Sequence, residues 1–240
     1  MKKFFFRIYF VIMAAVLFFY GIGVFFLLLF VKKENKNEFL RKRTPFFCKN
    51  TFEFFGIKPK VEGKENIPEG SYLMVANHES FLDAQLTLGY VDNDIYMIVK
   101  QELEKIPFAN LVAKNFGIPL NRDNPNQAVG ALKKAITFLR EGKKIAIFAE
   151  GTRHNDGIIH EFKKNSLKIA MIAKVPVLPV VFHGTGNLIP KGKYIMELSD
   201  VHVKILKPVN PSDYKKEEIM SEEIRSRMQY ELDKIIEGNE

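Results

Sequence analysis

Residues 72–83 have the sequence YLMVANHESFLD, in which an apolar run is followed at once by polar side chains. Such a run is typical of a buried strand whose carboxyl end lies at a ligand-binding edge. Four similar runs occur later in the chain, and helical patterns separate them. This alternation predicts an α/β fold: a single domain with a mixed, largely parallel sheet flanked by helices. The predicted strands are Tyr72–Ala76, Ile95–Val99, Ile145–Phe148, Val177–Phe182 and Val201–Leu206.

Three helices are predicted between and after these strands. The clearest begins with Asn124 as N-cap and Pro125 as first helical residue, and it ends before Gly142. A second covers residues 165–173, and a charged helix covers residues 212–236. We find no repeat and no low-complexity linker, so residues 61–240 are predicted to form one domain.

Residues 1–60 differ from the rest of the chain in charge and composition. The whole chain carries 36 basic and 28 acidic residues, net +8, but residues 1–60 alone carry 12 basic and 3 acidic. The same segment holds 15 of the 22 phenylalanines. The basicity therefore belongs to an apolar N-terminal segment and not to a folded basic face, which argues against nucleic-acid binding.

The run Ile8–Val31 contains 24 residues without a charge. As a helix it would be about 36 Å long, enough to cross the apolar layer of a bilayer. Gly21 and Gly23 also allow a shape that enters one leaflet only, so the sequence leaves both geometries open. The basic residues after the run predict that the main domain lies on the cytoplasmic side of a membrane; they are Lys32, Lys33, Lys36, Arg41, Lys42 and Arg43.

A second amphipathic segment follows, and it completes a membrane-associating pair of helices over residues 1–60. Thr44 and Pro45 are predicted as N-cap and first residue of this helix, and Gly56 as its end. One face is predicted to meet lipid. An ordinary helix packed on the domain is the alternative. The predicted lipid-facing residues are Phe47, Cys48, Phe52, Phe54 and Phe55.

The first candidate site is the segment that follows the strand at residues 72–76. His78 and Asp83 are five residues apart, which on a continuous helix would separate them by about 140°. If Ser80 caps the helix, His78 lies outside it and folds back over the first turn, where Asp83 accepts its ring proton. An imidazole held in this way can take a proton from a substrate hydroxyl. An exposed loop histidine without a role fits the same residues.

Three further stretches lie at strand ends or strand–helix corners. Gly117–Arg122 ends in an arginine, and Glu150–Arg153 places an arginine in a turn that contains glycine. Arginine suits phosphate oxygens, although Arg153 could equally pair with Glu150 as scaffold. The stretch Val175–Val180 is apolar, contains two prolines and by itself predicts only a buried strand.

Together the four stretches resemble the lysophosphatidate acyltransferase family, whose members make phosphatidic acid. The family motifs N-H-x4-D, an arginine block, E-G-T-R and V-P-V-x-P match residues 77–83, 117–122, 150–153 and 175–179. The resemblance covers roughly residues 60–210. Asn121 departs from it, because the family often has aspartate there.

The resemblance implies roles for particular residues. His78 would be the general base, and Asp83 would hold and polarise it. The acceptor would be the lipid lysophosphatidic acid, and the co-substrate acyl-CoA or acyl-ACP, so acyl carrier protein is a possible partner. No bound cofactor or metal is implied, and a single cysteine excludes a site of several thiolates. The residues implied at the acceptor phosphate are Arg122 and Arg153, with Lys100 as a weaker third, and Glu150, Gly151 and Thr152 shaping the pocket.

Other functions remain compatible with the sequence. The same residues could acylate glycerol-3-phosphate or another lysolipid, or His78 could activate water in a membrane esterase. No Gly-x-Ser-x-Gly sequence is present, which argues against a serine esterase. A lipid-binding protein at the membrane surface without activity is a further alternative.

Overall fold

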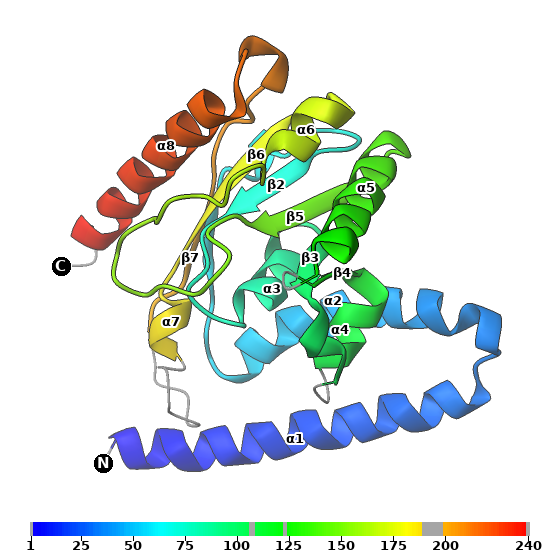
Figure 1. Ribbon diagram of the computed structural model, residues 1–240. Helices are drawn as coiled ribbons and strands as arrows, with labels where there is room; N and C mark the ends of the chain where they lie inside the picture. Colours follow the sequence, from blue (N-terminus) through cyan, green and yellow to red (C-terminus); the bar gives the residue numbers. More distant parts are fainter. Residues whose placement is uncertain (1, 106–108, 122–123, 189–198, 239–240) are drawn as a thin grey trace.

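A seven-stranded sheet forms the centre of the computed structural model, which describes residues 2–105, 109–121, 124–188 and 199–238 (Figure 1). Its strand order is β1-β7-β6-β2-β5-β3-β4. The strands β2 to β6 run parallel to one another, whereas β7 is antiparallel to β6 and parallel to β1. The predicted mixed, largely parallel sheet is confirmed. The strands are β1 (Lys60–Glu62), β2 (Leu73–Ala76), β3 (Ile95–Lys100), β4 (Gly117–Leu120), β5 (Lys144–Phe148), β6 (Val177–His183) and β7 (His202–Ile205).

All five predicted strands are present, and no strand end differs from its predicted position by more than one residue. The structure adds β1 and β4, two short edge strands. In β4 the residue Gly117 packs so closely on the preceding helix that a Cβ atom would lie 2.1 Å from the Ala113 carbonyl oxygen. Pro119 lies in the same strand, where an edge position tolerates a missing N–H donor. A strand of four residues with glycine and proline gives little sequence signal.

Helices cover both faces of the sheet (Figure 1). Alternate residues of each central strand face opposite layers: Met74 packs with α2 and α3, whereas Leu73 and Val75 pack with α5, α6 and α8. Both faces are therefore buried, as expected for parallel strands. The α-helices are α1 (Lys2–Phe30), α2 (Lys36–Phe54), α3 (Asp83–Leu86), α4 (Ala109–Phe116), α5 (Pro125–Arg140), α6 (Lys168–Ala173), α7 (Thr185–Leu188) and α8 (Glu217–Glu237). The 3-10 helices are η1 (Lys33–Asn35), η2 (Lys64–Asn66), η4 (Gln101–Lys105) and η5 (Pro211–Asp213), and η3 (Thr87–Val91) is a π-helical turn.

The three predicted helices of the domain are found, with different starting residues in two cases. Helix α5 begins as predicted, because the Asn124 side chain accepts a hydrogen bond from the N–H of Gln127. Helix α6 begins at Lys168 rather than at residue 165, since Asn165 has a φ of 65°. Helix α8 begins at Glu217, after the turn η5.

The predicted start of the second N-terminal helix is wrong. Helix α2 runs without interruption from Lys36 to Phe54 and contains Pro45 in its interior. The Thr44 hydroxyl donates to the carbonyl oxygen of Leu40, 2.8 Å away, instead of capping a helix. Pro45 removes one helical hydrogen bond. The free energy gained by burying apolar side chains of α2, such as Leu40 and Phe52, outweighs this loss. Gly56, with a φ of 73°, follows the end of the helix as predicted.

The predicted lipid-facing surface of α2 is wrong for three of its five residues, and for these three the alternative of a packed helix is confirmed. Cys48 and Phe52 are each 1% exposed, and Phe55 is 5% exposed. These residues belong to the apolar layer beneath the sheet. Burial raises the pKa of the Cys48 thiol to about 12, so this cysteine is no nucleophile. Phe46 and Phe54 are the exposed phenylalanines of α2.

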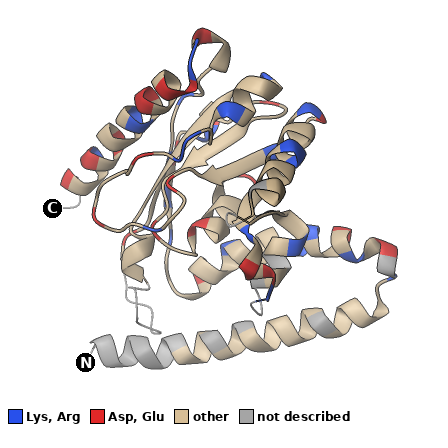
Figure 2. Ribbon diagram, in the orientation of Figure 1, with Lys and Arg blue, Asp and Glu red and all other residues tan. Residues whose placement is uncertain are grey.

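Helix α1 runs along one side of the body, beneath α2 and α4 in the view of Figure 1. Within it, residues 11–30 carry no charge and have a mean hydropathy of 2.6 (Figure 2). This helix is long and apolar enough to cross a membrane. Its contact with the body includes a stacked pair, Tyr20 on Phe47, with ring centroids 5.8 Å apart. The predicted boundary at residue 60 stays a prediction.

Candidate active site

The loop after β2 brings His78 and Asp83 together, as the sequence predicted. His78 Nδ1 lies 2.7 Å from Asp83 Oδ2. Asp83 is the first residue of α3, so His78 precedes the helix and folds back over its start. The predicted Ser80 cap is wrong, because Leu82 is the N-cap residue of α3; Ser80 instead accepts from the N–H of Asp83 through its carbonyl oxygen at 3.2 Å. The His78 ring stacks on Phe148, with centroids 4.3 Å apart.

Asp83 is surrounded by donors. Its Oδ2 also accepts from the backbone N–H groups of Glu79 and Ser80, at 2.8 and 2.9 Å. Its Oδ1 accepts from the Thr185 hydroxyl at 2.6 Å. The side chain of Asp83 is 0% exposed, whereas that of His78 is 20% exposed. A carboxylate held this way can only accept from His78, so Nδ1 carries a proton, and in the neutral ring Nε2 is then the nitrogen with the lone pair.

The backbone on either side of His78 is fixed by two further side chains. Asn77 bridges to β6: its amide donates to the Phe182 carbonyl and its oxygen accepts from the Phe182 N–H, both at 2.8 Å. Glu150 accepts from the backbone N–H of His78 at 2.9 Å and from that of His160 at 3.2 Å. Burial raises the pKa of Glu150 to about 6, although these two N–H donors oppose the shift.

Sequence reasoning missed the contribution of the turn after β6. Thr185 lies beside Asp83 because Gly184, with a φ of 88°, turns the chain so tightly that a Cβ would lie 1.9 Å from the Asp200 carbonyl. Glu79 braces the same turn, since it accepts from the Gly186 N–H at 3.2 Å and lies 3.4 Å from His183 Nδ1. The only local signal is a His-Gly-Thr-Gly sequence at a strand end.

The E-G-T-R segment lies next to this pair. The N–H of His154 donates to the carbonyl oxygen of His78 at 2.8 Å, which fixes the neighbouring Arg153 beside the loop. Arg153 is exposed and forms no ion pair or hydrogen bond with any described residue. The alternative in which Arg153 pairs with Glu150 is therefore wrong. Gly151 turns the chain with a φ of 75°, and Thr152 is exposed.

Lys100 and Leu120 are paired in register at the carboxyl ends of β3 and β4. Both strands therefore end at the same edge of the sheet. Arg122 itself lies outside the described residues. The structure places His78, Glu150 and Lys100 at carboxyl ends of parallel strands, where open α/β sheets bind ligands.

A hollow of about 580 Å³ lies elsewhere, between α2 and the segment 88–94. Its lining includes Arg41, Phe46 and Asp94 but none of the predicted site residues. The candidate site is defined by its hydrogen bonds.

The arrangement at His78 has a definite chemical meaning. A buried carboxylate that orients a histidine, with the second ring nitrogen turned to a partly open surface, is the device by which enzymes activate hydroxyl groups. The fold and the site together define an α/β protein with such a histidine–aspartate pair at the carboxyl edge of its sheet.

The chain belongs to the acyltransferase family, whose sequence profile matches residues 58–183. It is 33% identical over 171 residues to the 1-acyl-sn-glycerol-3-phosphate acyltransferase of Borreliella burgdorferi, covering 69% of this chain and 68% of the relative. It is likewise 33% identical over 180 residues to the chloroplastic 1-acyl-sn-glycerol-3-phosphate acyltransferase LPAT1 of Arabidopsis thaliana, covering 73% of this chain and 49% of that protein. The chain thus spans about half the length of the plant relatives it matches.

The fold matches a solved structure over nearly its whole length. The 1-acyl-sn-glycerophosphate acyltransferase PlsC of Thermotoga maritima superposes with a TM-score of 0.80 at 35% identity, covering 98% of this chain and 96% of the other. The apolar helix α1 and the membership in this family together indicate association with a membrane. The match extends through residues 1–60 as well as the domain.

Proposed function

We propose that this chain transfers an acyl group from an acyl thioester to the sn-2 hydroxyl of 1-acyl-glycerol-3-phosphate, which gives phosphatidic acid. One observation carries the proposal: the 2.7 Å hydrogen bond between His78 Nδ1 and the fully buried Asp83. The similarity to 1-acyl-sn-glycerol-3-phosphate acyltransferases supports the same acceptor.

In the proposed reaction, Nε2 of His78 takes the proton of the sn-2 hydroxyl while the oxygen of that hydroxyl attacks the carbonyl carbon of the thioester. The tetrahedral intermediate then collapses and the C–S bond breaks. The leaving thiolate takes the proton from Nε2, which returns His78 to its starting state. Asp83 keeps the ring in the productive tautomer and stabilises the imidazolium that forms between the two steps. Holding hydroxyl and thioester together itself lowers the barrier by several kcal/mol, on the order of the values for well-oriented reactants.

The acceptor phosphate would bind to the exposed guanidinium of Arg153. Its planar set of donors matches phosphate oxygens, and no described residue occupies it. Arg122 and Lys100 would supply further positive charge from the ends of β4 and β3. Gly151 and Thr152 would shape the pocket. Glu150 would support it from behind, through the backbone N–H groups of His78 and His160.

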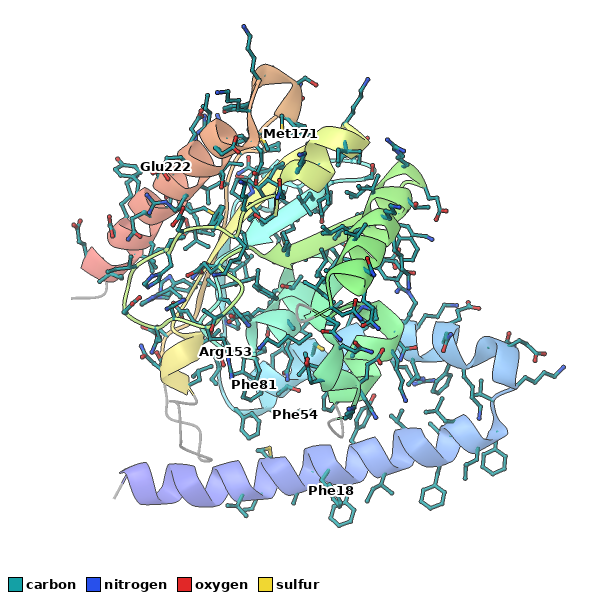
Figure 3. All side chains as sticks on the ribbon, viewed as in Figure 1. Phe18, Phe54, Phe81, Arg153, Met171 and Glu222 are labelled. Atoms are coloured by element: carbon teal, nitrogen blue, oxygen red, sulfur yellow. The ribbon has the colours of Figure 1, made fainter. Side chains whose placement is uncertain are left out.

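The membrane would lie on the side of α1. Arg153 and Phe81 lie on the half of the body nearer to α1, whereas Met171 and Glu222 lie on the far half (Figure 3). Phe81 is 51% exposed, so an apolar side chain accompanies the phosphate-binding arginine on this side. A lysophosphatidate keeps its tail in the bilayer and its phosphate at the surface, where basic residues attract it. We place the domain on the cytoplasmic side because of the basic residues that follow α1.

The direct experiment is an assay of the full chain in vesicles with two thioester donors and a panel of acceptors. The donors are acyl-CoA and acyl-ACP. The acceptors are lysophosphatidic acid, glycerol-3-phosphate and a lysolipid without a free phosphate. Product identity is measured by mass spectrometry, and the acylated position by sn-2-specific lipase digestion.

The expected result is phosphatidic acid with the new acyl group at sn-2, formed from at least one of the two donors. Preferred acylation of glycerol-3-phosphate or of the other lysolipid would replace the acceptor assignment. Release of free fatty acid without acylated product would indicate the esterase. Binding of the lipid with no turnover from either donor would indicate the inactive lipid-binding alternative.

A further inference from the structure

The loop between β5 and α6 carries a cluster of metal-ligating side chains that the acyl-transfer proposal does not use. His154, Asp156 and His160 each offer one ligand atom, and these three atoms lie within 4.8 Å of one another. The two imidazole rings stack with centroids 3.8 Å apart. His160 Nε2 lies 2.8 Å from Asp156 Oδ2.

The donor set selects a class of ion. Two imidazole nitrogens and one carboxylate oxygen suit zinc and its neighbours in the first transition series, whereas magnesium and calcium prefer oxygen ligands alone. In a tetrahedral site, zinc–ligand bonds of about 2.0–2.2 Å place two ligand atoms roughly 3.4 Å apart. Atoms that lie within 4.8 Å of one another therefore need to approach by up to about 1.4 Å, and rotation of the three side chains, all at least partly exposed, supplies this movement.

The backbone that carries these side chains is already held in place. Ile159, next to His160, is 0% exposed, and its N–H donates to the Gln229 side chain on α8 at 2.7 Å. The Arg225 guanidinium donates to the carbonyl oxygen of Ile159 at 3.2 Å. An ion would therefore bind a loop whose backbone is ordered before it arrives, which reduces the entropic cost of binding.

The carboxylate also has the support that metal ligands commonly have. Asp156 Oδ1 accepts from the N–H of Ile158 at 3.2 Å, which leaves Oδ2 turned toward His160. A hydrogen bond to one oxygen of a ligating carboxylate fixes the orientation of the other.

We propose that His154, Asp156 and His160 bind a divalent transition-metal ion of the zinc class, with the fourth position open to water. The ion would fasten the loop from residue 154 to residue 160. Both ends of this span contact the catalytic segment, since the N–H of His154 donates to the His78 carbonyl and the N–H of His160 donates to Glu150. The site is separate from the acyl-transfer chemistry and does not depend on it.

The test measures Zn²⁺ binding to the full chain in detergent micelles, without a polyhistidine tag and after treatment with a chelator. Competition with a chromophoric chelator gives the affinity and the stoichiometry. We expect one Zn²⁺ per chain, and at least a tenfold weaker affinity in His154→Ala and in His160→Ala, which is the order lost even when only a supporting residue is removed. His202→Ala is the matched control, because His202 lies on β7 outside the cluster, and its affinity should equal that of the wild type.

Two further readouts keep the proposal testable if an alanine variant fails to fold. Co²⁺ bound to the wild-type chain should give the intense visible absorption of a low-coordinate nitrogen and oxygen site, and Asp156→Asn should change that spectrum. Zn²⁺ should also slow tryptic cleavage after Arg153 in the wild type.

The proposal is overturned if the wild-type chain binds no Zn²⁺. It is equally overturned if His78→Asn abolishes binding while His154→Ala retains it, because the ion would then occupy the candidate active site. If saturating Zn²⁺ leaves the rate of cleavage after Arg153 unchanged, the ion does not stabilise residues 154–160, which contradicts the proposed site.

Discussion

Two histidine–aspartate pairs lie close together in this chain and have nearly the same length, 2.7 Å for His78–Asp83 and 2.8 Å for His160–Asp156. Their surroundings differ. Asp83 is 0% exposed and accepts from three donors besides His78. The Asp156 side chain is 47% exposed, and its partner His160 is also in contact with solvent. Glu150 contacts the backbone of both histidines.

This comparison shows that distance alone does not identify a catalytic pair. An exposed ion pair is screened and contributes about 1 kcal/mol or less. A buried carboxylate that accepts from several fixed donors holds its partner in one orientation and one tautomer. We therefore assign proton transfer to the first pair and metal binding to the second.

The largest difference is expected from removing each histidine in turn. His78→Asn should lower the rate of phosphatidic acid formation roughly 1,000-fold, within the range for a positioned general base. His160→Asn should cost about tenfold or less, since His160 reaches the candidate active site indirectly, through its backbone contact with Glu150 and its stacking on His154. Initial rates in vesicles, with circular dichroism as the folding control, decide the matter. Equal losses in the two variants would contradict the distinction between the pairs.

The two aspartates should differ in the same direction. Asp83→Asn should lower kcat roughly 100-fold or more, because the amide no longer fixes the proton on Nδ1. Asp156→Asn should cost less than about fivefold, the value of an exposed pair. The measurement is kcat at saturating acceptor and donor. A loss in Asp83→Asn no larger than in Asp156→Asn would show that the buried pair is only structural.

Arg153, which lies beside the His78 loop, should act on acceptor binding rather than on proton transfer. Arg153→Ala should raise the KM for the phosphorylated acceptor roughly 10- to 100-fold, the value of a lost charged hydrogen bond, with a smaller change in kcat. Arg153→Lys should restore part of the affinity, since it keeps the charge without the planar donors. An unchanged KM in Arg153→Ala would remove the phosphate role.

Thr185 tests whether the donors around Asp83 matter. Thr185→Val removes the hydroxyl that donates to Oδ1 and should lower kcat about tenfold, the cost of leaving a buried acceptor without its donor. Thr185→Ser keeps the hydroxyl and should remain close to the wild type. If both variants keep full activity, the support from the β6 turn is dispensable.

The smallest expected effect concerns Glu150, which joins the two pairs. Burial raises its pKa from 4.5 to about 6, which means that the folded chain favours the protonated carboxyl group. The stability gained from this preference is fully present below pH 4.5 and is lost as the pH rises through 6. Glu150→Gln does not titrate, so its unfolding temperature relative to that of the wild type should rise between pH 4.5 and pH 6.5. Thermal unfolding of the two chains in the same detergent measures this difference. A constant difference across the range would contradict the raised pKa.

The sequence was sufficient for the central strands and for the His78–Asp83 contact, because both depend on local patterns. The strand runs have strong hydrophobic patterns, and His78 and Asp83 lie within six residues of one another. It was insufficient where distant contacts decide the structure. Thr185 lies 102 residues from Asp83, and the buried face of α2 became clear only from its packing against η3.

The His154–Asp156–His160 cluster could not be predicted for a similar reason. Its spacing matches no common metal-binding motif, and its geometry depends on contacts between the loop and α8, such as that between Ile159 and Gln229. The edge strand β4 is too short and too rich in glycine and proline to give a strand pattern.

The most direct test of the account is the protonation state of the His78 ring, measured by nitrogen-15 NMR of the histidine side chains in the full chain at neutral pH. The His78 signals are assigned by their loss in His78→Asn. The account predicts a protonated Nδ1 and an unprotonated Nε2. A proton on Nε2 with none on Nδ1 would contradict it, because Asp83 would then not hold the ring and the nitrogen that faces the acceptor could not accept a proton.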